Sequence, residues 1–141
     1  EGKGIAHSYR KGKKVIFDEA TGLMWQQCGS GNQLTFDEAV EYINKLNKKK
    51  FRGYKDWRLP TLEEAMSLME PSTMVGNSID PLFDIKQKNI WTSDKEKAEL
   101  SPWVVYFFKN GCCGFFDKNL PIAHYKYWRH FVRAVRSGQS S

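Results

Sequence analysis

The side chains that could do chemistry in this sequence are its histidines, its cysteines and its paired carboxylates. His7, His124 and His130 are widely separated, and no Gly-x-Ser-x-Gly turn exposes a nucleophilic serine. The acidic pair Glu63-Glu64 is explained by helix capping. The sequence therefore predicts neither a catalytic triad nor a working carboxylate pair, and we expect no catalytic residues and no enzyme.

The three cysteines, Cys28, Cys112 and Cys113, lack the Cys-x-x-Cys pairs and the spacing of a zinc site, so we expect no structural metal. If residues 112 and 113 lie in a strand, their side chains point to opposite faces, and only one of them could reach Cys28. One disulfide, from Cys28 to either Cys112 or Cys113, is compatible with the sequence.

Rings and cations alternate along residues 115–130, and this pattern suits binding. Aromatic faces stack on the apolar faces of sugars, while Lys and Arg meet sulfate or carboxylate groups. The expected ligand-binding residues here are Lys118, Tyr125, Lys126, Tyr127, Trp128, Arg129 and His130, and a second basic patch comprises Lys48, Lys49, Lys50 and Arg52. The alternative is that the rings of Tyr125, Tyr127 and Trp128 cover the sheet or pack a subunit interface.

The charge and the apolar runs of the chain indicate which classes of partner it can bind. The chain has 141 residues, with 22 Lys and Arg against 16 Asp and Glu, and its net charge of +6 should attract polyanions. Most of the lysines, including Lys11, Lys13 and Lys14, also fit a solvated surface. No nucleic-acid-binding motif is present, so nucleic acid is not expected. The longest apolar runs fall far short of the roughly 20 residues of a membrane span, which predicts no membrane insertion.

Two helices are predicted by Thr-x-x-Glu capping boxes. The first begins at Thr35 with Glu38, and an apolar stripe follows at helical spacing. The second begins at Thr61 with Glu64 and is a short helix of two to three turns. The residues of the first stripe are Phe36, Ala39, Val40, Ile43 and Leu46.

The remainder predicts strands at Val15–Phe17, Leu23–Gln26, Ile90–Thr92, Val104–Phe108, Phe115–Phe116 and Phe131–Val135. Asn110-Gly111 predicts a tight turn that pairs its flanking strands antiparallel, with the strand at 103–108 central. We expect one α+β domain over residues 5–137, with two helices packed against a mainly antiparallel sheet and flexible ends at 1–4 and 138–141. Trp25, Trp57 and Trp91 are expected to build its core.

Four ordered segments carry a family resemblance: Asp18-Glu-Ala-Thr-Gly-Leu-Met-Trp25, Tyr54-Lys-Asp-Trp-Arg-Leu-Pro-Thr61, Ile90-Trp-Thr-Ser93 and Val132-Arg-Ala-Val-Arg136. The chain resembles the C-terminal domain family of the Legionella collagen-like adhesin (Lcl). The resemblance implies a C-type-lectin-like fold, whose skeleton is similar to that of formylglycine-generating enzymes. In that fold Arg58 and Arg133 would be structural, each reaching a carboxylate or a backbone carbonyl.

The resemblance also sets the expected function. The Lcl domain binds sulfated polysaccharides, so we expect an extracytoplasmic module, secreted, on the cell surface or in the periplasm, for a sulfated or anionic polysaccharide or another surface ligand. The segments at 79–82 and 91–93 lack the motifs of a lectin calcium site, and adjacent cysteines do not converge on copper, so no cofactor is expected. The alternative is a protein-interaction or sensor domain of a larger receptor, kinase or assembly protein, and a homo-oligomer is compatible with either.

Overall fold

The structure is a computed structural model that describes residues 7–69, 79–84, 86–95, 102–107, 113–116 and 128–138. In chain order its elements are β1 (Tyr9–Lys11), β2 (Val15–Asp18), β3 (Leu23–Gln26), α1 (Phe36–Lys48), the 3₁₀ turn η1 (Phe51–Gly53), α2 (Leu62–Ser67), β4 (Asn89–Lys95), β5 (Pro102–Phe107), β6 (Cys113–Phe116) and β7 (Val135–Ser137). The α+β class predicted from the sequence is confirmed.

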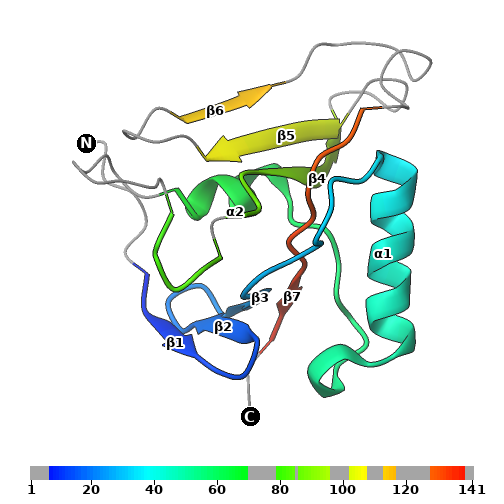
Figure 1. The fold of residues 1–141 in the computed structure, drawn as a ribbon. Coiled ribbons are helices and arrows are strands. Elements are labelled where there is room, and N and C mark those ends of the chain that lie inside the picture. The colour runs from blue at the N-terminus through cyan, green and yellow to red at the C-terminus, as the bar shows by residue number, and fades with distance from the viewer. Residues whose placement is uncertain are drawn as a thin grey trace.

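The strands form two antiparallel sheets rather than the single sheet that was expected. One sheet has the order β1-β2-β3-β7 and the other has the order β4-β5-β6. Figure 1 shows the four-stranded sheet at the bottom, the three-stranded sheet at the top, and α1 standing alongside them. The predicted hairpin partners β5 and β6 do pair antiparallel, and β5 is the central strand. The turn predicted at Asn110-Gly111 lies outside the described residues.

The C-terminal segment links the two sheets, which explains why the strand predicted at residues 131–135 is not continuous. Phe131 makes a parallel bridge to Ile90 in β4, and His130 bridges Leu34 just before α1. The chain then reaches β3, where Val135 of β7 lies opposite Trp25. One segment therefore takes partners from three places, and only its last residues form a strand.

Both predicted capping boxes are confirmed. Thr35 and Thr61 each accept a hydrogen bond from the backbone N–H of the glutamate three residues on, and each glutamate side chain accepts from the capping residue's N–H. These contacts satisfy N–H groups that a helix start leaves without partners. Helix α2 has six residues, less than two turns, so it is shorter than expected.

The tryptophan core is confirmed, since Trp25, Trp57 and Trp91 are 1%, 2% and 0% exposed. The indole N–H of Trp91 donates to the carbonyl of Leu34 at 2.8 Å, and that of Trp57 donates to the carbonyl of Phe51 at 3.0 Å. Burial of an indole requires such a partner. The two rings therefore also fix the chain at the two ends of α1.

The two structural arginines are also confirmed. Arg58 pairs with Glu64 through two hydrogen bonds of 2.7 and 2.9 Å. Arg133 is fully buried and donates to the backbone carbonyls of Gln26, Gln27 and Asp84. Burial lowers the pKa of Arg133 to about 10, which still leaves the side chain charged near neutrality. Its charge is stabilised by carbonyl dipoles inside the fold.

Cys28 is an exposed, free thiol, so the disulfide that the sequence allowed is not formed in the structure. Its two candidate partners cannot be compared, because Cys112 and the side chain of Cys113 lie outside the description. Of the predicted flexible ends at 1–4 and 138–141, residues 1–4 and 139–141 also lie outside it. Gly138 donates its N–H to the carbonyl of Gly22 at 3.1 Å.

Candidate anion-binding surface

The first predicted binding segment is only partly described. Lys118, Tyr125, Lys126 and Tyr127 lie outside the described residues. Arg129 is exposed, as a ligand contact requires. The neighbouring ring of Trp128 is half-buried and packs against the main core cluster, as the alternative interpretation expected.

His130 was predicted to contact a ligand, but it lies inside the fold. The residue is only 7% exposed. Its ring packs edge-on against Trp91, with the ring centroids 4.8 Å apart, and its Nδ1 lies 2.9 Å from Oδ1 of Asn89. Burial lowers the pKa of His130 to about 4, so the ring is neutral at physiological pH. A neutral, enclosed ring is part of the core, and a sequence pattern of alternating rings and cations could not reveal its burial.

The second predicted patch is exposed at the C-terminal end of α1. Lys48 ends the helix, Lys49 caps it, and Lys50 and Arg52 both have a φ of 52°, in the left-handed region. This turn is tied to the core because the carbonyl of Phe51 accepts the hydrogen bond from the Trp57 indole. The predicted lysines and arginine are therefore held on an anchored turn.

A second basic cluster meets this turn, and the sequence analysis did not predict that the two come together. Lys11, at the end of β1, and Lys13 and Lys14, on the turn that follows, are exposed. Lys14 also has a positive φ of 66°. We call the combined surface the basic corner, and it comprises Lys11, Lys13, Lys14, Lys48, Lys49, Lys50 and Arg52. Only tertiary structure joins its halves, because a turn and a helix end supply them.

Two pockets lie where the clusters meet. The first, which we call the Arg52 pocket, has a volume of about 200 Å³. The second, the Lys49 pocket, has a volume of about 280 Å³. The Arg52 pocket is lined by Arg10, Gly12, Lys13, Val15, Phe17, Met24, Arg52 and Tyr54. The Lys49 pocket is lined by Lys14, Gln26, Cys28, Gly29, Tyr42, Leu46, Lys49 and Phe51.

Positive charges are in excess around these pockets. Among the described residues that line them, neither pocket has a carboxylate. Arg10 pairs with Glu19 at 3.1 Å, whereas no ion pair within the described part of the chain engages the residues of the basic corner. The nearby carboxylate of Asp56 is held by Arg136 at 2.6 Å, and that hydrogen bond keeps the pKa of Asp56 below its usual value. The corner therefore presents net positive charge.

The described part of the first predicted patch, residues 128–130, lies apart from the basic corner. His130 is bridged to Leu34 just before the start of α1, whereas the basic corner lies at the end of this 13-residue helix. A rise of 1.5 Å per residue places the two ends of α1, which Figure 1 shows beside the two sheets, ~20 Å apart. A ligand that touches both the segment at residues 128–130 and the basic corner would have to span about this distance.

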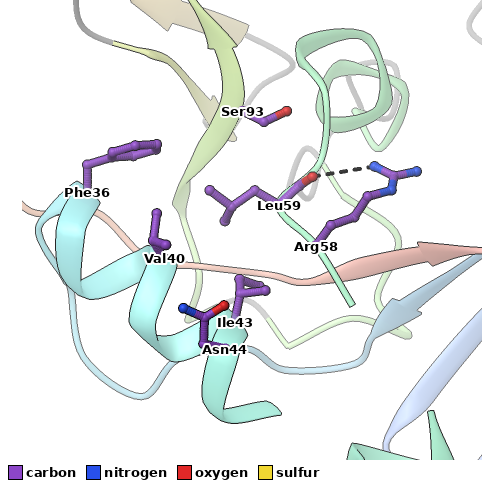
Figure 2. Close-up of a pocket in the computed structure, with 7 residues that line it drawn as sticks. All are labelled: Phe36, Val40, Ile43, Asn44, Arg58, Leu59 and Ser93. Carbon is purple, nitrogen blue, oxygen red and sulfur yellow. Dashed lines mark hydrogen bonds between the residues drawn. The ribbon is translucent and has the colours of Figure 1, made fainter. Parts of the chain in front are cut away.

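A third pocket lies beside α1 and is mostly apolar. Figure 2 shows its lining residues, which are Phe36, Val40, Ile43, Asn44, Arg58, Leu59 and Ser93, and its volume is about 310 Å³. Val40 was expected in the buried stripe, but it is 40% exposed and lines this pocket. The guanidinium of Arg58 is already paired with Glu64, so this pocket offers little free charge.

In the part of the chain that the structure describes, no three His, Cys, Asp or Glu side chains gather as metal ligands would. Nor does any described helix have the length and apolar character that crossing a membrane requires.

Comparison with known proteins gives one match. A family model described as the Lcl C-terminal domain matches residues 14–136, which is most of the chain and includes Lys14 and the whole α1 end of the basic corner. No curated protein matches the chain, and no solved structure matches it.

Proposed function

Because the chain belongs to the Lcl C-terminal domain family, we propose that it is a non-catalytic binding module for sulfated or otherwise anionic polysaccharide, with the basic corner as its binding surface. The observation that carries the proposal is the meeting of two basic clusters, distant in sequence, around two pockets without a carboxylate in their described linings. We place its action outside the cytoplasm, since the resemblance is to a domain of a bacterial adhesin.

Electrostatics decides how such a surface binds. An exposed ion pair contributes only about 0.2–1 kcal/mol, so one sulfate on one lysine binds weakly. When several cations bind one polysaccharide chain at once, their small favourable free energies add up. Their combined electric field also raises the local concentration of the polyanion. Because the side chains are exposed, the Debye length of about 10 Å at 0.1 M salt predicts that added salt weakens binding strongly.

The test measures binding of heparin, as a sulfated polysaccharide, and of dextran, as a neutral one, at low and high salt. We expect salt-sensitive binding of heparin and none of dextran. The variant Lys49→Gln/Arg52→Gln removes one cation from each pocket and should weaken heparin binding at least about tenfold, which corresponds to about 1.4 kcal/mol.

The matched control is Lys86→Gln/Lys88→Gln, which removes the same charge from two exposed lysines outside the pocket linings. If the control weakens binding equally, only net charge matters and the corner is not the site. A third variant, Lys126→Gln/Arg129→Gln, tests the first predicted patch. If that variant alone abolishes binding, the ligand sits at the first predicted patch instead.

The second candidate is a protein-interaction or sensor role within a larger protein. It would be favoured if heparin, carboxylated glycans and dextran all failed to bind at low salt, because a polyanion site with this charge would be strongest there.

A further inference from the structure

The two pockets of the basic corner are immediate neighbours. Lys13 lines the Arg52 pocket and the next residue, Lys14, lines the Lys49 pocket. On the opposing turn the same alternation occurs, since Phe51 lines the Lys49 pocket and Arg52 lines the other. Adjacent residues on both turns thus face different pockets, so one shared wall separates them.

Each pocket contains one cation from each cluster. In the Arg52 pocket these cations are Lys13 and Arg52, and in the Lys49 pocket they are Lys14 and Lys49. A guanidinium fork can hold two oxygens of a sulfate or carboxylate, while an ammonium acts as a point charge. Each pocket therefore has the charge to hold one anionic group between two turns of the chain.

We propose, on the basis of the function proposed above, that the two pockets are successive subsites for a single linear polysaccharide, and that each holds one of its sulfate or carboxylate groups. Binding of the first group makes binding of the second intramolecular, at a high effective concentration. Affinity then depends on a chain long enough to reach both pockets, and a lone anion binds poorly.

The aromatic side chains favour a polysaccharide over a nucleic acid. Proteins that bind single-stranded nucleic acid stack bases on accessible rings. Here the guanidinium of Arg136 lies 3.8 Å from the centre of the Tyr54 ring, and that of Arg10 lies 5.0 Å from the centre of Phe17. The exposed large apolar side chains in the described part of the chain are Val40 and Met66, neither of which lines the two pockets. Charge, and not base stacking, is what the corner offers.

The wall of the Lys49 pocket is fixed by the fold. The hydroxyl of Tyr42 accepts a hydrogen bond from Nε2 of Gln26 at 2.9 Å, while Oε1 of Gln26 accepts from the N–H of Ala134 at 2.8 Å. Burial raises the pKa of Tyr42, so its hydroxyl stays neutral and adds no repulsion for an anion. This wall of the subsite is therefore preorganised, while its two lysines have long, flexible side chains.

The experiment uses heparin oligosaccharides of increasing defined length and a monosaccharide sulfate, with affinity measured by calorimetry. The wild-type chain should show a step, an increase of at least about tenfold in affinity per chain, at the length that first spans both pockets. The variants Lys13→Gln/Arg52→Gln and Lys14→Gln/Lys49→Gln each remove one subsite. In either variant the step should disappear, while the weak affinity for the monosaccharide sulfate falls no more than about twofold, because one subsite remains.

The control Lys86→Gln/Lys88→Gln should keep the step, and a thermal melt of each variant verifies its folding. A length series without a step, or a step that survives in both single-pocket variants, overturns the two-subsite proposal while the binding function stands. Failure of every heparin chain to bind overturns the function itself. Equal affinity for length-matched single-stranded DNA would assign the corner to nucleic acid instead.

Discussion

The burial of His130 predicts a loss of stability in mild acid. Its folded-state pKa of about 4 lies below the unfolded value of 6.5, so between these values the unfolded chain binds a proton that the folded chain excludes. The contribution of His130 is complete above the unfolded pKa and is lost as the pH falls toward the folded one. Integration of this difference gives a loss of about 2 kcal/mol in the free energy of unfolding from about pH 7 to about pH 5, and about 3 kcal/mol by about pH 4.

Above about pH 5, the predicted change in the free energy of unfolding comes from this histidine and not from the buried carboxylates. Burial alone would raise the pKa of Asp18, but hydrogen bonds from Ser8, His7, Thr21 and Ala20 outweigh it and hold that pKa below its usual value. Burial would also raise the pKa of Glu64, and the hydrogen bonds from Arg58 and Thr61 lower it. Both acids therefore lose their contribution only at lower pH.

Urea unfolding at the two pH values measures the effect, with His130→Phe as the matched variant. Phenylalanine keeps a ring against Trp91 but cannot titrate, and it loses the Nδ1 contact with Asn89. Each protein's own stability near neutrality therefore serves as its reference. The wild type should lose about 2 kcal/mol more than the variant on acidification. Equal losses would refute the burial argument.

His130→Phe should also leave heparin affinity unchanged, whereas a loss of binding would return His130 to the ligand surface.

Three further changes test the contacts that shape the corner, each by chemical unfolding at neutral pH. Gly29→Ala should cost about 2 kcal/mol or more, since φ is +155° there and an added Cβ would lie 2.1 Å from the carbonyl oxygen of Val132. Asn47→Ala should cost about 2–4 kcal/mol, because its amide makes hydrogen bonds of 2.9 and 2.7 Å to the backbone of Trp57. Lys50→Gly should instead stabilise by about 0.5–1 kcal/mol, because it relieves a left-handed backbone, while weakening heparin binding. An unchanged stability in any of the three would contradict the corresponding contact.

Local signals in the sequence predicted the local parts of this fold well. The two Thr-x-x-Glu boxes mark helix starts because a hydroxyl and a carboxylate within one turn satisfy that turn's own N–H groups. The pairing of β5 with β6 was predicted from the Asn110-Gly111 dipeptide between two apolar segments that are neighbours in the sequence. Such features depend on residues close together in the chain, so the pattern alone contains the necessary information.

The parts that the sequence did not predict depend on distant partners. The segment that includes His130 and Phe131 takes hydrogen-bonding partners from Leu34 and β4, and β7 takes its partner from β3. Periodicity within the segment therefore does not reveal whether it is a strand or whether its histidine is buried. Val40 has the spacing of a core residue, yet it is 40% exposed in the lining of the apolar pocket beside α1. Burial in such positions is a property of the packed molecule.

The candidate site shows the same division. The basic residues on each turn were visible in the sequence, but their meeting depends on the core. Trp57 holds Phe51 through its indole N–H, and this contact fixes the turn that presents Lys50 and Arg52. Three cations of the basic corner, Lys14, Lys50 and Arg52, occupy left-handed backbone positions, each costing about 1–2 kcal/mol that glycine would avoid. Strain of this kind concentrates where side chains serve a site. Long cationic side chains occupy all three of these positions in the basic corner, which is why we propose the basic corner, and not the apolar pocket beside α1, as the ligand-binding surface.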